Sequence, residues 1–280
     1  MISLVQLGTV DYATGLRLQQ ELVALRKEEK IGDILLLLEH SPVITLGRNA
    51  KAANVIASPE LLAQRRVEMF ECDRGGDVTF HGPGQIVGYP IFDLRGFAMP
   101  DGKRKTLGAV EFVRRLEEVL IRTCADFAIP TKRVQGLTGV WTDLKGHDFS
   151  RADNTQDKEA ASAAEVGADA KLAAIGVHIS RFVTSHGFAL NVNTDLSYFN
   201  LIIPCGITAK PVTSMQQELG KPLDLNAVAE SISRNFGTVF FSQMLWIDTI
   251  DALLGRTVGV PMRPPAELRQ LHKEDDSTWA

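Results

Sequence analysis

The sequence predicts an α/β (α+β) fold in which helices and strands are mixed along the whole chain. Two patterns support this: three segments have apolar residues three and four positions apart, and several short apolar runs end at glycine or proline. No internal repeat is visible. With 45% hydrophobic and 23% charged residues, the 280-residue chain has the composition of a globular protein with a substantial core.

Three amphipathic helices are predicted, over residues 11–30, 106–127 and 225–241. Gly32 follows the first and Pro130 follows the second, as expected for helix ends. Cys124 lies on the apolar stripe of the second helix and is therefore predicted to be a core residue.

The predicted strands are short apolar runs bounded by breaks. Two of them, Ile34–Leu38 and 43–46, are separated by Ser41 and Pro42 and are expected to be buried. The others lie at 67–72, 77–80, 85–92, 172–180 and 187–192.

The predicted domain organisation is a catalytic domain over residues 1–245 and a C-terminal extension over 246–280, partly a loose tail. An exposed insertion is expected at about 144–170, which is rich in Ala, Asp and Glu and has no periodicity.

Charge and cysteine content exclude several classes of protein. Thirty basic against 34 acidic residues leave a net charge of −4, so no nucleic-acid partner is expected. The three cysteines form no C-x-x-C pair, which indicates neither a disulfide framework nor a metal site. The first residues lack a secretion signal and the longest apolar run, Ile34–Leu38, is too short to span a membrane, so a cytoplasmic protein is expected.

A glycine-rich segment at 74–85 is the first candidate for function. Glycines let a ligand approach the backbone closely, and here they surround Arg74, Thr79 and His81. The segment has neither G-x-x-x-x-G-K-[ST] nor G-x-G-x-x-G, the patterns of phosphate and dinucleotide loops. The alternative is a hairpin with glycine turns.

Cys205 is the second candidate, because it stands between Pro204 and Gly206 in a predicted loop. A nucleophilic cysteine needs its thiolate stabilised by about 2 kcal/mol at neutral pH, which one nearby cation supplies. Lys171, His178 and His186 are the candidate cations. The alternatives are a buried cysteine, a solvated lysine at a strand end and a histidine on a strand face.

Five sequence blocks together resemble the octanoyl-ACP:protein octanoyltransferases, the lipoyl (octanoyl) transferase B family of lipoate biosynthesis. They span roughly residues 34–220 in the family order, and Asp195, Leu196 and Phe199 follow the fourth. The blocks are R-G-G-D-V-T-F-H-G-P-G-Q (74–85), G-V-W-T-D (139–143), K-L-A-A-I-G-V (171–177), H-G-F-A-L-N-V (186–192) and P-C-G-I (204–207). The resemblance implies a biotin/lipoate protein ligase-like catalytic domain, with a mixed β-sheet flanked by helices and a tunnel for an eight-carbon acyl chain.

The resemblance also implies roles for individual residues. Cys205 aligns with the acyl-accepting nucleophile and Lys171 with the lysine that activates it; no cofactor and no metal are implied. Because glycine has no side chain and alanine only a methyl group, these residues are expected to leave room for a narrow acyl slot. The implied substrate-binding residues are Arg74, Gly75, Gly76, Asp77, Val78, Thr79, Phe80, His81, Ala174, Ile175, Gly176, Gly187, Phe188 and Ala189.

The implied reaction is acyl transfer in two steps without ATP. Octanoyl-acyl carrier protein would be the donor, and apo lipoyl domains of 2-oxoacid dehydrogenase complexes and the glycine cleavage H protein would be the acceptors. Either Lys171 or His81 would take the proton of the attacking amine. Basic residues 103–105 or 132–133 are candidates for docking these partners, the alternative being an ordinary solvated surface.

Three other functions stay open at this point. An ATP-dependent lipoate or biotin-type protein ligase would share the fold but would not need Cys205. An octanoyl amidotransferase acting between lipoyl domains would use a cysteine with a different donor. An inactive acyl-binding module would have no need for Lys171 and Cys205 together.

One departure from the family pattern is the insertion, because the family usually passes quickly from the tryptophan-bearing strand to the lysine strand.

Overall fold

The computed structural model describes residues 1–98, 103–143, 169–203 and 210–255. Its main feature is an eight-stranded mixed sheet in which the first three strands are parallel and the remaining neighbours are antiparallel. In spatial order, the strands are β13 (Met244–Trp246), β1 (Ile2–Val10), β2 (Asp33–His40), β6 (Gln85–Ile91), β12 (Val183–Asn191), β11 (Asp169–Ser180), β10 (Leu137–Asp143) and β9 (Lys132–Val134).

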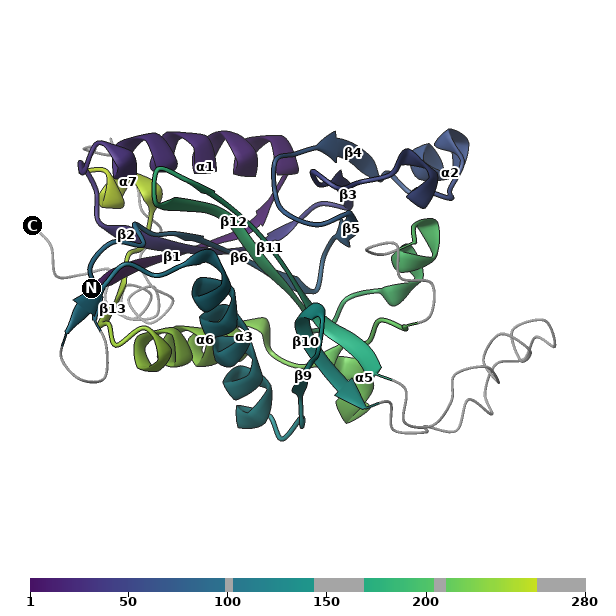
Figure 1. The fold of residues 1–280 in the computed structure, drawn as a ribbon. Helices are drawn as coiled ribbons and strands as arrows, with labels where there is room; N and C mark the ends of the chain where they lie inside the picture. Colours follow the sequence, from purple (N-terminus) through teal and green to yellow (C-terminus); the bar gives the residue numbers. More distant parts are fainter. Residues whose placement is uncertain (99–102, 144–168, 204–209, 256–280) are drawn as a thin grey trace, which may run out of the picture.

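Helices cover both faces of this sheet (Figure 1). Helix α1 (Tyr12–Lys27) and the short α7 (Ile250–Leu253) lie on one face, and α3 (Ala109–Asp126) and α6 (Leu225–Val239) lie on the other. Strand β2 is therefore buried on both of its faces. Its Leu35 and Leu37 belong to the core cluster under α3 and α6, whereas Leu36 and Leu38 belong to the cluster under α1. Burial on both faces explains why residues 34–38 of this strand are an uninterrupted apolar run.

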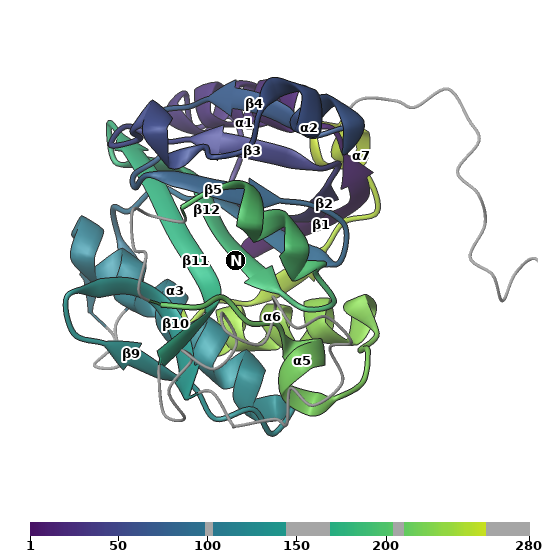
Figure 2. The same ribbon diagram turned by 90° about the vertical axis from the view of Figure 1, so that its right-hand side faces the viewer.

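The remaining elements lie at the ends and edges of the main sheet (Figure 2). A three-stranded sheet lies beside the short helix α2, and a pair of antiparallel strands of two residues each precedes α3. The elements are β3 (Val43–Leu46), β4 (Glu68–Glu71), β5 (Val78–His81), β7 (Phe97–Ala98), β8 (Arg104–Lys105), α2 (Pro59–Gln64), α5 (Met215–Leu219) and the 3₁₀ turns η1 (Ala52–Asn54) and η2 (Leu196–Leu201).

The three predicted helices and all the predicted strands are present, shifted by a few residues at their ends. Side-chain caps fix two helix starts, where the carboxylates of Asp11 and Asp224 accept hydrogen bonds from the backbone N–H groups of Thr14 and Asn226. Cys124 is buried as predicted, and burial raises the pKa of its thiol to about 12, which keeps it protonated.

Described strands extend across two of the predicted domain boundaries, at residues 170 and 245. Strand β11 begins at Asp169 and Ala170 is fully buried, so the strand includes the last two residues of the predicted insertion. Strand β13 and helix α7 continue the fold past residue 245. The rest of the insertion, residues 144–168, and residues 256–280 lie outside the described residues. No helix in the described ranges is long and apolar enough to cross a membrane.

Candidate active site

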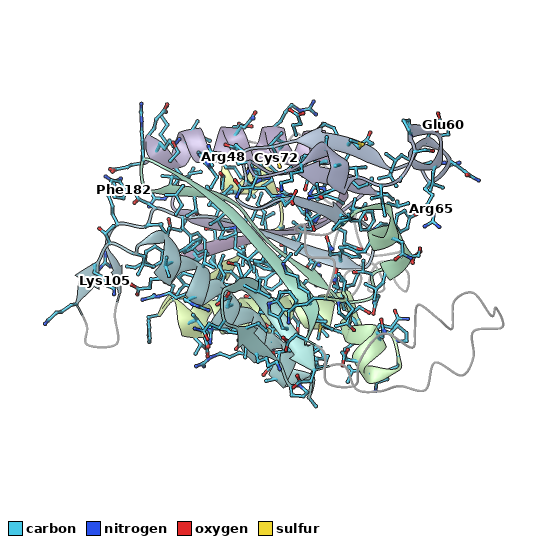
Figure 3. The ribbon with its side chains drawn as sticks, turned by 45° about the vertical axis from the view of Figure 1, so that its right-hand side comes forward. Arg48, Glu60, Arg65, Cys72, Lys105 and Phe182 are labelled. Carbon is cyan, nitrogen blue, oxygen red and sulfur yellow. The ribbon has the colours of Figure 1, made fainter. Side chains whose placement is uncertain are left out.

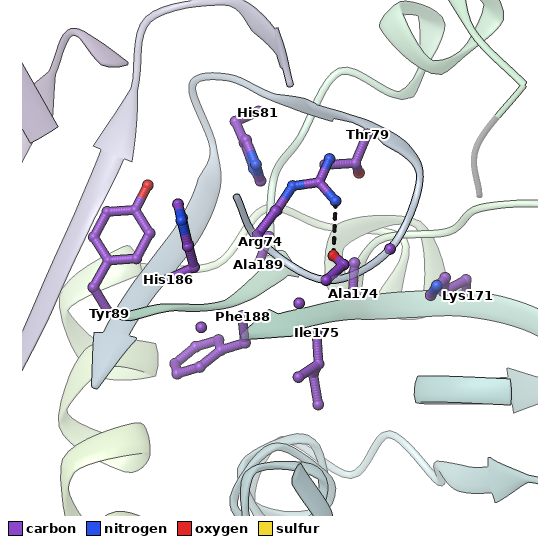
Figure 4. A pocket seen from close by; sticks show the side chains of 14 residues that line it. Arg74, Thr79, His81, Tyr89, Lys171, Ala174, Ile175, His186, Phe188 and Ala189 are labelled. Carbon is purple, nitrogen blue, oxygen red and sulfur yellow. Dashed lines mark hydrogen bonds between the residues drawn. The ribbon is translucent and has the colours of Figure 1, made fainter. Parts of the chain in front are cut away.

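A cavity of about 470 Å³, a volume that includes open solvent at its mouth, lies between the loop at residues 74–77 and strands β11 and β12 (Figure 4). The sequence-predicted site residues that line it are Arg74, Gly75, Gly76, Thr79, His81, Lys171, Ala174, Ile175, Gly176, Gly187, Phe188 and Ala189. Tyr89 and His186 complete the lining. Asp77, Val78 and Phe80 do not line the cavity, and Cys205 lies outside the described residues.

Small residues form one wall of the cavity because the glycine loop packs directly on the sheet. On β11 and β12, Ala174 pairs with Ala189 and Gly176 pairs with Gly187. The backbone N–H of Gly75 donates to the carbonyl of Val177 at 3.1 Å, and a Cβ on Gly176 would lie 2.6 Å from the Gly75 oxygen. Gly176 is therefore required for this close approach of loop and strand.

The simple hairpin considered for residues 74–85 is not what forms. Strand β5 pairs with β3 in the small sheet, while β6 pairs with β2 and β12 in the main sheet. The two strands that flank the G-P-G turn thus belong to different sheets, and the loop before them forms a wall of the cavity.

Arg74 holds this loop to the small sheet. Its guanidinium donates to the hydroxyl of Thr45 at 2.9 and 3.1 Å, to the Thr45 carbonyl at 2.6 Å and to the Gly75 carbonyl at 3.1 Å. These acceptors are all neutral, and Arg74 is only 8% exposed. The site therefore contains a buried positive charge that these hydrogen-bond acceptors do not neutralise, and this charge favours an electron-rich group in the cavity.

His81 is buried on the same side of the cavity, and its Nδ1 lies 2.7 Å from the Gln85 side-chain oxygen. The Gln85 amide nitrogen donates to Asn191, which leaves that oxygen as the acceptor for an Nδ1–H of His81. Burial, with a further contribution from His40, lowers the pKa of His81 to about 3. His81 is thus a neutral imidazole and a weak base.

Lys171 lies at the other end of the cavity from Tyr89 and His186 (Figure 4). Its ammonium nitrogen is 5.2 Å from the centroid of the Trp141 ring, within the range of a cation–π contact. Gly139, with φ of +122°, makes this placement possible, because a Cβ there would lie 2.9 Å from the Lys171 Cε. Lys171 is half-buried in β11, so the alternative of a solvated lysine at a strand end is wrong.

The chain next to Cys205 is attached to the strand that carries Lys171. The backbone N–H of Lys171 donates to the Pro211 carbonyl at 2.8 Å, and Thr213 donates back to the Lys171 carbonyl at 3.0 Å. On the other side of residues 204–209, the N–H of Ile203 donates to Asn54 at 2.7 Å. The described residues on both sides of the Cys205 segment are therefore fixed, one of them directly at Lys171.

The two histidines considered as cations for Cys205 face another group. Nε2 of His186 lies 2.7 Å and that of His178 lies 3.6 Å from the carboxylate of Asp73. Burial lowers the pKa of His186, against the opposing effect of its bond to Asp73. His178 does not line the cavity, which leaves Lys171 as the candidate that combines cavity lining with a contact to the tryptophan of its sequence block.

Comparison with known proteins identifies the family. Residues 11–237 match the family of lipoyl protein ligase A/B catalytic domains. The chain is 58% identical to the octanoyltransferase of Koribacter versatilis over 98% of both chains, and 53% identical to that of Acidobacterium capsulatum over 91% of this chain and 96% of the relative. The chain belongs to the octanoyltransferase family. This membership confirms the resemblance seen in the sequence and the prediction of an acyltransferase enzyme.

Solved structures confirm the predicted fold class. A structure of an archaeal lipoylation system with a bi-partite lipoate protein ligase, from Thermoplasma acidophilum, covers 91% of this octanoyltransferase-family chain and 89% of its own chain, with a TM-score of 0.60 and 11% identity. Lipoate-protein ligase A bound with ATP covers 91% of this chain and 92% of its own, with a TM-score of 0.61 and 10% identity. At such identities the likeness shows the fold alone.

Tyr89 is not among the residues that the sequence predicts for the candidate active site, and His186 is predicted there only as a candidate cation. Tyr89 lies in the predicted strand at 85–92, between Gly88 and Pro90, which is an unusual setting for a buried tyrosine, whereas His186 lies one position before the predicted strand at 187–192 and inside the observed β12. His186 has a φ of +55°, a backbone conformation that the sequence does not reveal.

Several residues of the basic clusters proposed for docking form ion pairs with acidic residues of the same chain. Lys105 pairs with Glu111, Lys132 with Asp143 and Asp169, and Arg133 with Glu117 and Glu118. Lys105 lies at the end of the molecule opposite Glu60 and Arg65 (Figure 3). Nothing in these contacts distinguishes a docking surface from an ordinary solvated one, so the docking role stays a prediction.

The buried histidines of this family member predict a loss of stability in mild acid. The pKa of His81 is about 3 in the folded chain and near 6.5 in the unfolded one. The unfolded chain therefore takes up the proton first, and the stability present above pH 6.5 is lost progressively between pH 6.5 and about 3. By pH 5 the loss from this histidine is expected to reach about 2 kcal/mol.

The measurement is the free energy of unfolding in urea at several values between pH 5 and 7.5, for the wild type and His81→Gln. The variant should have a shallower slope, with the remainder contributed by His40 and His186, whose pKa values burial also lowers. An identical slope in both proteins would contradict the assignment of a neutral His81.

Proposed function

We propose that this protein transfers an octanoyl group from acyl carrier protein to a specific lysine of apo lipoyl domains, through a thioester on Cys205, as part of lipoate biosynthesis in the cytoplasm. The observation that carries the proposal is the cavity, which has Lys171 at one end and small residues along one wall. Family membership supports the same transfer. The acceptors we propose are the lipoyl domains of 2-oxoacid dehydrogenase complexes and the glycine cleavage H protein.

In the first step, the Cys205 thiolate attacks the carbonyl carbon of the acyl carrier thioester. A carbon–sulfur bond to Cys205 forms, and the bond to the carrier sulfur breaks. The carrier leaves as a thiolate and takes a proton from the Lys171 ammonium, which becomes a neutral amine. The reaction exchanges one thioester for another, so no activating nucleotide is consumed.

In the second step, the neutral ε-amine of the acceptor lysine attacks the acyl-Cys205 carbonyl. The amide bond forms, and the Cys205 sulfur leaves as a thiolate. The neutral Lys171 left by the first step takes the proton of the attacking amine, which restores the original thiolate and ammonium. His81 is the poorer proton acceptor, because its pKa is lowered to about 3 by burial. One lysine therefore serves as the acid of the first step and the base of the second.

Two other functions make different demands on the substrates. An ATP-dependent lipoate or biotin-type ligase would require ATP and a free acid, and would not form an acyl-cysteine. An amidotransferase would take the octanoyl group from a lipoyl domain. The shared fold with lipoate ligases does not separate these functions, whereas the choice of donor does.

The experiment is intact mass spectrometry of the full-length protein after incubation with octanoyl-acyl carrier protein and no ATP, with Cys205→Ala beside it. The expected result is one octanoyl group on the wild type and none on the variant, followed by loss of the group when an apo lipoyl domain is added. Labelling that requires ATP and free octanoate would replace the proposal with the ligase function. Labelling from an octanoylated lipoyl domain alone would favour the amidotransferase.

A further inference from the structure

We propose that His186 and Tyr89 form the closed end of the acyl cavity and so set the length of the acyl chain that the protein accepts. This inference rests on the proposed function, because it assigns a chain-length limit to the same cavity. It begins from the two lining residues that sequence reasoning did not place in the site.

The position of these residues follows from the strand pairing. Val177 is paired with His186 and lies six positions after Lys171 on β11, so His186 and Lys171 lie at different ends of this stretch of the sheet. Figure 4 shows the same arrangement, with Lys171 at one end and His186 and Tyr89 at the other. An acyl group attached beside Lys171 would therefore point its methyl end toward these two side chains.

His186 is also the boundary between two cavities. A second cavity of about 900 Å³, measured out to solvent, lies on the other side of it, and His186 is the residue that both cavities share in the described part of the chain. The second cavity is lined by Leu16, Gln19, Gln20, Val23, Lys27, Glu71, Cys72, Asp73, His178, Ser180, Val183, Ser185 and His186. Removing the imidazole would connect the acyl cavity to this space.

Both side chains are held rigidly. His186 is bonded to Asp73 through Nε2 at 2.7 Å, and its backbone N–H donates to the buried side-chain oxygen of Gln19 at 2.8 Å. The Tyr89 hydroxyl lies 2.6 Å from His40 Nε2. His40 Nδ1 lies 2.8 Å from the Val10 carbonyl and must carry the proton of that bond, so Tyr89 donates to Nε2.

Rigid walls make chain length a matter of fit. A chain that stops short of His186 leaves the end of the cavity unfilled, and a longer one meets two side chains that cannot rotate away without breaking their hydrogen bonds to Asp73 and His40. One methylene in such a pocket changes discrimination by about tenfold or more. His186 also has a φ of +55°, so its exact backbone shape is tolerated best by glycine or asparagine.

The test compares acyl chains of six to fourteen carbons on acyl carrier protein, scored by the mass of the acyl-enzyme and the rate at which it forms. The wild type is expected to prefer eight carbons. In His186→Gly the rate with twelve carbons, relative to eight, should rise at least about tenfold, because the chain enters the second cavity. Tyr89→Leu should shift the preference in the same direction.

His178→Ala is the matched control, because His178 lies near the same carboxylate of Asp73 and lines only the second cavity. It should keep the wild-type preference. Thermal unfolding of each variant shows that it is folded, and Tyr89→Leu provides a second reading where His186→Gly is unstable. An unchanged chain-length profile in the folded variants would overturn the inference, whereas a wild type that takes no acyl group from any donor would overturn the proposed function instead.

Discussion

Replacing Gly187 by alanine is expected to cost at least about 3 kcal/mol of the free energy of unfolding. A Cβ at this position would lie 2.1 Å from the Gly88 oxygen and 2.6 Å from the Pro90 Cδ. Both neighbours are in strand β6, which pairs with β12 in the middle of the main sheet and is buried along its whole length. Neither can move aside without breaking strand pairing on both sides, and 3 kcal/mol is a large part of the stability of an ordinary domain.

The check is urea denaturation of Gly187→Ala beside Gly32→Ala. Gly32 has open space around a new Cβ and needs no unusual φ, so its variant should lie within about 0.5 kcal/mol of the wild type. Equal stabilities for the two variants would show that β12 and β6 are not packed as closely as described.

The fold could be predicted wherever burial leaves a periodic pattern in the sequence. Helix α3 has an apolar stripe facing the core, and residues 34–38 of β2 are all apolar because both faces of the strand are covered. Strand β13 has no such signal. It has three residues, and its place in the sheet comes from pairing with β1, whose residues lie more than 200 positions earlier in the chain. Contacts of that kind are set by the finished fold and not by local sequence.

The small residues of the candidate site could be predicted from the sequence, whereas the partners of its polar side chains could not. The residues that line the cavity because of their small size were recognised by their glycine- and alanine-rich blocks. The partners that fix the polar side chains were not, because Arg74 is bonded to Thr45, 29 positions away, and His186 to Asp73, 113 positions away. Asp73 lies beside both His186 and His178, and only His186 of the two also lines the cavity, so the choice among candidate cations needed the structure.

Replacing Lys171 by methionine is expected to slow formation of the acyl-enzyme by a factor of about 10² to 10⁴ without unfolding the chain. Methionine keeps the unbranched apolar stem that packs beside Trp141 and Gly139, and removes the ammonium. In the proposed mechanism, the variant loses the cation that favours the Cys205 thiolate and the acid that protonates the departing carrier thiolate. The measurement is the single-turnover rate with octanoyl-acyl carrier protein, with thermal unfolding of the same samples.

The pH dependence separates the loss of this cation from a general disturbance of the site. Without Lys171, the fraction of thiolate should follow that of an ordinary cysteine, with a pKa of about 8.5, so the rate in Lys171→Met should rise nearly tenfold per pH unit below that value. Lys221→Met, which removes an exposed lysine outside the cavity, should have the wild-type rate and profile. A Lys171→Met rate that stays low and flat from pH 6 to 8.5 would contradict a role in thiolate formation. It would place the contribution of the lysine in proton transfer to the leaving carrier, because that loss is not recovered when the thiolate forms on its own.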